Sequence, residues 1–397
     1  MISAARRSRL ILASEVLAGL LAAAVLAAGC GGSASHLVWV PAKPSALVSS
    51  APGVRDQPAS AGPARPPGVA GRYRVDERQM VLAEPAHVGV TGQHLGERSL
   101  LTVIRYPAAR GASGSWAAGG PFPLVMFAPG FRQCSGTYEN LLQAWASAGY
   151  VVASVDFPRT SCQVAATAYE PDLVNQPADV SYVLGQLLAL NAQPGGFFSG
   201  RLNPREVAAA GQSDGGDTVA ALGANACCQD HRLKAVAVLS GAEWPPMPGR
   251  YFPGGAPPML FVQGSADTIN PPWTSVQLYR ADQASSRYYL DLFGSDHMIP
   301  YTGDNPVERL VARVTLAFFG RYLLGDKAAM STIRRTADSS GIAALGANAC
   351  CQDHRLKAVA VLSGAEWPPM PGRYFPGGAP PMLFVEGSAD TINPPWT

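Results

Sequence analysis

The sequence predicts an α/β protein with a doubly wound, mostly parallel sheet of eight strands and helices on both faces. Three observations support this prediction. Short apolar runs rich in β-branched residues alternate with longer stretches of helical periodicity. The middle runs are apolar throughout, as strands covered on both faces require. Hydrophobic residues make up 47% of the 397 residues, which is enough for a sizeable core in one large domain.

Eight short apolar runs bounded by turn residues are predicted as strands. They span residues 79–84, 100–106, 123–129, 150–157, 206–211, 233–240, 258–264 and 287–293. Stretches with helical periodicity are predicted as helices at residues 138–148, 177–191, 213–224, 272–284 and 306–324. The strand–helix–strand order implies right-handed crossovers, so functional residues are expected just after the strands.

The N-terminus is typical of an export signal. Three arginines in the first ten residues precede an apolar run at residues 16–28, which is short for a spanning helix. The run ends in Leu-Ala-Ala-Gly-Cys, and small residues before a cysteine resemble a bacterial lipobox. We therefore predict a signal peptide over residues 1–29, lipid attachment at Cys30 and an extracytoplasmic, cell-envelope lipoprotein held at the membrane. An ordinary secretory signal and an uncut anchor are the alternatives.

Composition sets the remaining boundaries. Residues 30–71 are rich in Ser, Ala, Pro and Gly and lack periodicity, so they are predicted as a tether, followed by a domain over residues 72–335.

The formal net charge is +2, and there is no basic stripe or aromatic-interleaved cluster of Lys and Arg. Nucleic acid is therefore not expected as a partner.

A near-perfect partial repeat occupies the last part of the sequence. Residues 220–274 and 343–397 match at 54 of 55 positions, and the one difference is Gln263 against Glu386. Repeat architectures contain diverged units at short periods, so this copy indicates a recent duplication or an error in sequence assembly. The copy starts inside a predicted helix and lacks partner strands. We therefore predict that residues 336–397 are a linker plus partial duplicate, loosely attached or misfolded, with exchange of the second copy into the first copy's place as an alternative.

The sharpest chemical motif is Gly-Gln-Ser-Asp-Gly at residues 211–215, which fits G-x-S-x-G between a predicted strand and a predicted helix. The turn is tight, so the residues two away from the serine must lack side chains. The helix N-terminus beneath it favours a developing negative charge. We predict that Ser213 is a nucleophile. The alternative is a glycine-rich turn in which Ser213 caps the helix.

A serine hydroxyl is a poor nucleophile unless a base takes its proton. Of the six histidines, only His297 follows the last predicted strand directly, and the fold places the acid between the serine and the histidine in the chain. Asp267 lies three residues beyond a predicted strand and is predicted to orient His297 and stabilise its imidazolium. Asp296 is a poorer candidate because it is adjacent to His297, and Asp291 lies within a strand.

The second copy has the equivalent acidic turn at Asp390, but no histidine follows it. Thr336 stands at the position equivalent to Ser213, outside any G-x-S-x-G. The repeat alone is therefore not predicted to be a second active site.

Two backbone N–H groups are needed to hold the oxyanion of an acyl-transfer intermediate. One is predicted from Asp214, the residue after the nucleophile. The other is predicted from Phe131 in the loop after the third predicted strand, where Gly130 lets the backbone approach closely.

Several stretches together resemble one enzyme family over about residues 75–335: RYPA, PFPLVMFAPGF, WASAGYVVASVDFP, GQSDGG, GSADTINPP and GSDH. The sequence resembles Ser-dependent α/β-hydrolases. It is most similar to the branch that contains bacterial cutinases and polyester hydrolases, chlorophyllase-like and platelet-activating-factor-acetylhydrolase-like esterases, and dienelactone-hydrolase-like proteins. The resemblance implies an α/β-hydrolase fold and carboxylic-ester hydrolysis through an acyl-enzyme, with no metal or organic cofactor.

The resemblance also suggests a substrate pocket. Polyester hydrolases have an aromatic residue after the glycine of the oxyanion loop and a tryptophan after the sixth strand. Phe131 and Trp244 hold those places and are expected to line an acyl pocket, with ordinary packing as the alternative for Trp244. Gln212 and Asp214 stand where that group usually has His and Met.

The cysteines suggest one disulfide. Cys134 and Cys162 follow neighbouring predicted strands on the active-site side, and an oxidising compartment would let them pair. The adjacent Cys227 and Cys228 lack the C-x-x-C spacing of a zinc site, so no metal is expected.

The sequence as a whole predicts an exported serine esterase that acts on small-molecule or lipid esters. One alternative is acyl transfer to an envelope lipid or sugar with the same triad. The other is a surface binding lipoprotein on an inactive hydrolase scaffold.

Overall fold

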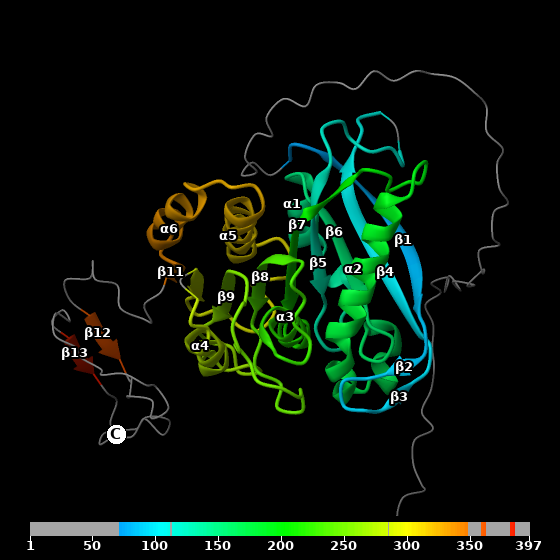
Figure 1. The fold of residues 1–397 in the computed structure, drawn as a ribbon. Coiled ribbons are helices and arrows are strands. Elements are labelled where there is room, and N and C mark those ends of the chain that lie inside the picture. The colour runs from blue at the N-terminus through cyan, green and yellow to red at the C-terminus, as the bar shows by residue number, and fades with distance from the viewer. Residues whose placement is uncertain (1–70, 112, 285, 348–358, 363–381, 386–397) are drawn as a thin grey trace, which may run out of the picture. The chain divides into compact units, whose positions relative to one another are not determined.

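A computed structural model describes residues 71–347, apart from residues 112 and 285, together with residues 359–362 and 382–385 (Figure 1). The predicted signal peptide, the predicted lipid-attachment residue Cys30 and nearly all of the predicted tether lie outside the described residues. None of the described helices is both long enough and apolar enough to span a bilayer.

The central feature is a nine-stranded sheet in the order β1-β4-β6-β5-β7-β8-β9-β10-β11. Six adjacent strands, from β6 to β10 in that order, run parallel, and β1, β4 and β11 are antiparallel to their neighbours. The strands are β1 (Arg74–Glu84), β4 (Arg98–Ala108), β5 (Phe122–Ala128), β6 (Val151–Asp156), β7 (Leu202–Gln212), β8 (Leu233–Leu239), β9 (Met259–Gly264), β10 (Arg287–Leu292) and β11 (Ala343–Ala347). Two short strands, β2 (His87–Val88) and β3 (His94–Leu95), form a separate hairpin.

Helices cover both faces of the sheet. They are α1 (Glu139–Ser147), α2 (Gln176–Ala192), α3 (Asp214–Ala224), α4 (Pro272–Ala281), α5 (Pro306–Leu323) and α6 (Ala329–Ser339), with 3₁₀ turns η1 (Ser135–Tyr138), η2 (Cys162–Thr167) and η3 (Glu170–Asn175). Buried residues of α1, α5 and α6 share one core cluster, and those of α2, α3 and α4 share another. Successive residues of β5 alternate between the two clusters, as the period of a strand requires.

The predicted fold class is confirmed, and all eight predicted strands and all five predicted helices are present within a few residues of their expected bounds. The predicted number of strands was wrong, because β11 adds a ninth at the edge of the sheet, beside β10. Residues Ala343 and Leu345 of β11 are buried in the core cluster that contains α5 and α6. The prediction that the chain from residue 336 is loosely attached is therefore wrong for residues 336–347, and the domain extends beyond residue 335.

β11 has the sequence Ala-Ala-Leu-Gly-Ala, which is also the sequence of residues 220–224 at the end of α3. In α3 these residues continue a helix that is already formed. In β11 they follow Gly341, whose φ of 73° turns the chain, and then meet the edge of β10. A new helix needs a costly first turn, whereas an open strand edge offers backbone partners at once. The surroundings, and not the five residues, decide the conformation.

Two further strands belong to the second copy. β12 (Val359–Leu362) and β13 (Met382–Val385) pair in parallel, with Val359 opposite Met382. β8 and β9 pair in the equivalent register, with Val236 opposite Met259. The copied strands thus keep the pairing of the strands that they repeat.

Candidate active site

The turn between β7 and α3 holds Ser213 in a strained conformation. Its φ of 56° lies in the left-handed region, which non-glycine residues rarely adopt. A Cβ at Gly211 would lie 2.0 Å from the carbonyl oxygen of Gly215, and a Cβ at Gly215 would lie 1.9 Å from that of Ala128. Both motif glycines are therefore required by close backbone approach. The side chain of Ser213 makes no capping hydrogen bond to α3, unlike the alternative that the sequence left open.

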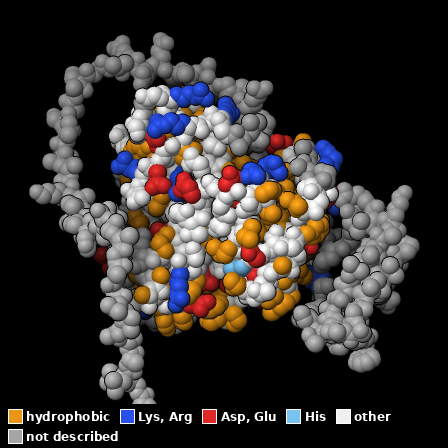
Figure 2. All heavy atoms as spheres, turned by 180° about the vertical axis from the view of Figure 1, so that it is seen from behind, with side chains coloured by type: hydrophobic (Ala, Val, Ile, Leu, Met, Phe, Trp, Pro, Cys, Tyr) orange, Lys and Arg blue, Asp and Glu red, His pale blue; other side chains and the backbone are white. Residues whose placement is uncertain are grey.

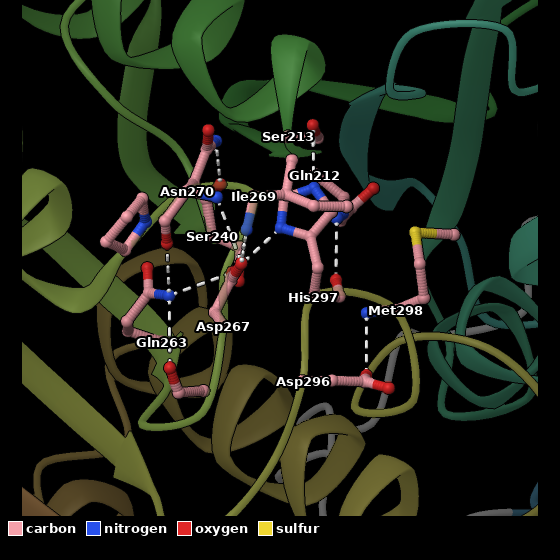
Figure 3. Close-up of polar contacts among 12 residues, drawn as sticks. Gln212, Ser213, Ser240, Gln263, Asp267, Ile269, Asn270, Asp296, His297 and Met298 are labelled. Atoms are coloured by element: carbon pink, nitrogen blue, oxygen red, sulfur yellow. Dashed lines mark hydrogen bonds and ion pairs between the residues drawn. The ribbon is translucent and has the colours of Figure 1, made fainter. Parts of the chain in front are cut away.

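Ser213, His297 and Asp267 form a continuous hydrogen-bonded chain, drawn in Figure 3. Nε2 of His297 lies 2.8 Å from Oγ of Ser213, and Nδ1 lies 2.7 Å from Oδ2 of Asp267. Ser213 follows β7, Asp267 follows β9 and His297 follows β10, so three parallel strands deliver the three side chains to one edge of the sheet. The structure thus brings together the three residues that the sequence singled out.

Asp267 is held as an anion. Burial acts to raise its pKa, but the hydrogen bond and charge of His297, with the backbone N–H groups of Asn270 and Ile269, lower the pKa below its ordinary value. Those N–H groups donate to Oδ1 over 3.0 and 2.9 Å. An ionised carboxylate at Nδ1 fixes the tautomer in which Nε2 can accept the serine proton.

The two predicted oxyanion donors lie at the start of α3 and in a loop that passes close to Ser213. Asp214 is the first residue of α3, where backbone N–H groups have no acceptor within the helix. Phe131 follows Gly130, and a Cβ at Gly130 would lie 3.1 Å from Cβ of Ser213. The oxyanion loop therefore passes directly against the nucleophile turn.

A buried hydrogen-bond network that sequence reasoning missed connects these parts. Nε2 of Gln212 donates to the backbone carbonyl of His297 over 3.0 Å. The hydroxyl of Tyr138 donates to Oε1 of Gln212 over 2.8 Å and accepts from the N–H of Gly130 over 3.1 Å. The only signal in the sequence is a glutamine at the end of an apolar strand.

The carboxyl of Asp214 is a second feature that the motif alone did not reveal. It is buried, and its Oδ2 has no hydrogen-bond partner among the residues that the structure describes. Burial, with a contribution from the charge of Glu170, raises the pKa of Asp214 to about 7. A titrating carboxyl group therefore sits on the residue whose N–H is predicted to hold the oxyanion.

The predicted substrate residues differ in their surroundings. Phe131 is partly buried, and the guanidinium of Arg132 lies 4.9 Å from the centre of its ring. Trp244 packs against a buried cluster that includes Leu173 and Met247, which is the packing role left open by the sequence.

Apolar side chains beside the acid and base were not predicted. Ile269 is 65% exposed, Trp273 48% and Ile299 52%, and each lies within six residues of Asp267 or His297 in the sequence. Hydrophobic side chains also gather on the lower part of the face shown in Figure 2, while most Lys and Arg side chains lie on its upper part. The exposed residues near the triad would suit an apolar substrate.

A disulfide joins Cys134, in the oxyanion loop, to Cys162 at the start of η2. The same loop is held by hydrogen bonds from the N–H of Arg132 to the carbonyl of Thr160 and from the N–H of Ser135 to Asp156. The adjacent Cys227 and Cys228 are also joined. Among the residues that the structure describes, no three His, Cys, Asp or Glu side chains are grouped as a metal site would require.

The sheet order, the strained nucleophile turn and the three strand-end residues define an α/β-hydrolase. Residues 104–351 match the model of a family described as PET hydrolase-like (PETase), and the chain belongs to that family. A comparison with curated proteins found no match. Membership of the family makes the protein a carboxylic-ester hydrolase, and the expected resemblance to cutinases and polyester hydrolases is confirmed.

Proposed function

We propose that the protein is an exported serine esterase in which Ser213, His297 and Asp267 are the catalytic triad. The observation that carries this proposal is the unbroken chain of hydrogen bonds from Oδ2 of Asp267 through His297 to Oγ of Ser213. A serine hydroxyl bonded to a histidine that is itself oriented by a carboxylate is the arrangement that activates a serine for attack.

The proposed reaction has two halves. Oγ of Ser213 attacks the ester carbonyl while Nε2 of His297 takes its proton, and the N–H groups of Asp214 and Phe131 hold the oxyanion. His297 returns the proton to the leaving alkoxide, and an acyl-enzyme remains. Water then loses a proton to His297 and attacks the acyl group, which releases the acid and restores Ser213.

The substrate is proposed to be a small-molecule or lipid ester with an apolar part. The exposed side chains of Ile269, Trp273 and Ile299 support this choice, since an apolar substrate would cover them. Phe131 is proposed to line the acyl pocket. The loop that carries Trp244 is proposed to contribute to the same acyl pocket.

Export is proposed from the basic and apolar N-terminal segment, with Cys30 as the lipid-bearing residue. The disulfide between Cys134 and Cys162 is consistent with an oxidising compartment. Incorporation of radiolabelled palmitate into the full chain, expressed in a bacterium, and its absence from Cys30→Ala would support the anchor. Equal labelling of both proteins would exclude Cys30.

The catalytic proposal is tested with a fluorophosphonate probe and a series of p-nitrophenyl esters. Wild-type protein is expected to be labelled and to hydrolyse the esters, whereas Ser213→Ala should lose labelling and at least about 10³-fold in kcat. Ser331→Ala, in α6, is the matched control and should behave as wild type. A wild-type protein that is folded but neither labelled nor active would favour the binding lipoprotein. Faster product release with an added alcohol acceptor, with an ester as the product, would favour acyl transfer.

A further inference from the structure

Gln263, near the end of β9, places its amide against the acid of the proposed triad. The side chain is fully buried. Its Nε2 donates to Oδ2 of Asp267 over 3.0 Å and to the backbone carbonyl of Asn270 over 3.0 Å, as Figure 3 shows. Oδ2 of Asp267 is the same oxygen that receives Nδ1 of His297.

The chemistry of the surroundings fixes the orientation of this amide. Three oxygens surround Nε2, from Asp267, Asn270 and Gly264, and the last lies at 3.2 Å. Oε1 instead accepts a hydrogen bond from Oγ of Ser275 over 2.6 Å. A reversed amide would place its oxygen against three oxygens that cannot donate a proton. Gln263 therefore acts as a donor toward Asp267.

The donated hydrogen bond completes the restraint on the carboxylate. Oδ1 of Asp267 is occupied by two backbone N–H groups, and Oδ2 by His297 and Gln263. With both oxygens bound, the carboxylate cannot rotate away from Nδ1. Each of these donors also favours the ionised form of the acid.

We propose that Gln263 is a positioning residue of the triad, which holds Asp267 in the orientation and the ionised form that His297 requires. This inference rests on the proposed serine-esterase function. Gln263 touches neither Ser213 nor the substrate in this scheme, and it acts through Asp267 alone.

The repeat supplies an independent reason to examine this position. Among the 55 repeated positions, the single difference is Gln263 in the first copy and Glu386 in the second. A glutamate at position 263 would bring a second carboxyl group to Oδ2 of Asp267, and repulsion between the two would raise the pKa at which the second carboxyl ionises. The pair would add negative charge beside His297 as the pH rises. The single difference between the copies thus falls on a position whose side chain contacts Asp267 in the first copy.

The test compares Gln263→Glu, Gln263→Met and the matched reverse change Glu386→Gln in the full chain. Ester hydrolysis is measured from pH 5 to pH 9 as kcat and KM, and folding is followed by thermal unfolding. The acidic limb of the pH profile reports protonation of the base. The ionisable groups around Asp267 are His297, Tyr301 and, on the exposed side, Asp296, and all three are unchanged in the series.

Gln263→Glu should lower kcat by about 10-fold or more, leave KM within about twofold and move the acidic limb to higher pH by about one unit. The acidic limb moves to higher pH because added negative charge beside His297 favours the protonated form of that base. Gln263→Met should lower kcat with a smaller movement of the limb, since it removes the donor without adding charge. Glu386→Gln should match the wild type in every respect.

Two results would overturn the inference: wild-type kcat in both Gln263 variants, or a loss of kcat that accompanies unfolding with no movement of the pH profile in either variant. If Gln263→Glu does not fold, the kcat and pH profile of Gln263→Met still test the inference. A wild-type protein without labelling at Ser213 would instead overturn the proposed function, so the two failures are distinguishable.

Discussion

The amide of Gln212 donates a hydrogen bond to the backbone carbonyl of His297 over 3.0 Å, although the two residues lie 85 positions apart in the chain. Since Gln212 directly precedes Ser213, one buried side chain connects the nucleophile turn to the loop that carries the base. Tyr138 extends the connection to Gly130 in the oxyanion loop. One buried network therefore links the turn of Ser213 and the loop of His297, the proposed nucleophile and base, to the loop of the proposed oxyanion donor Phe131.

Replacing Gln212 by leucine should impair both activity and stability. The change would remove the donor to the buried carbonyl of His297 and the acceptor for the hydroxyl proton of Tyr138, which costs about 1–3 kcal/mol of unfolding free energy. We also expect kcat to fall by about 10-fold, because the loop of His297 would lose its restraint on the side of Ser213. Urea unfolding and ester hydrolysis measure the two effects. Tyr138→Phe, which removes only the hydroxyl, should show a smaller loss of both, and an unaffected Gln212→Leu would contradict the role of the network.

Asp214→Asn should change how the folding stability depends on pH. The carboxyl keeps its proton in the folded state up to a pKa of about 7, whereas its ordinary value is near 3.9. The folded state thus binds more protons than the unfolded state between these values, and stability falls as the pH rises through that range. The asparagine variant should lack this fall and be more stable than wild type at pH 8 by about 1–3 kcal/mol. Chemical denaturation at pH 5 and pH 8 gives the comparison.

The same substitution should raise kcat above pH 7 relative to wild type. An ionised Asp214 places negative charge beside the N–H group that is proposed to hold the oxyanion, and this disfavours the transition state. Glu170→Gln removes a charge that raises the pKa of Asp214, so Asp214 should ionise earlier and the alkaline loss of activity should move to lower pH. Identical alkaline limbs in the three proteins would contradict this electrostatic effect.

A chain that ends after residue 347 should be more stable than one that ends after residue 335. The shorter chain lacks β11 and the last turn of α6, including the buried side chains of Ala337, Ala343 and Leu345. It would also leave β10 as an open edge, which promotes association between molecules. Thermal unfolding and light scattering of the two chains test this, and equal values would show that β11 adds nothing to the domain.

Removing the disulfide between Cys134 and Cys162 by double substitution to alanine should cost about 2–4 kcal/mol of unfolding free energy. The bond closes a loop across 28 positions of sequence and anchors the oxyanion loop. We expect kcat to fall more than KM rises, since the loop carries the N–H of Phe131. Unchanged stability under oxidising conditions would show that the two thiols do not pair.

The proximity of the three residues of the proposed triad could be predicted from the sequence because each follows a strand whose apolar pattern is plain. The order of parallel strands then brings Ser213, Asp267 and His297 to one edge of the sheet. Each prediction needed only a local pattern and a general rule of topology.

The supporting residues could not be predicted in the same way. Gln212 and Gln263 look alike in the sequence, as single polar residues at the ends of apolar strands. Their roles depend on which atoms of distant loops their amides meet, and local periodicity carries no information on that. β11 was missed for a related reason, since its five residues form part of a helix in the first copy and become a strand only beside β10.

β11 shows how a sheet edge can use part of a repeat. Its five residues are not a complete unit of structure, yet they extend the sheet because the edge of β10 offers backbone partners to an extended chain. Leu345 is buried there, so removal of β11 would uncover apolar side chains of the core that α5 and α6 share. A repeated segment can in this way contribute to the stability of a domain without acquiring any chemistry of its own.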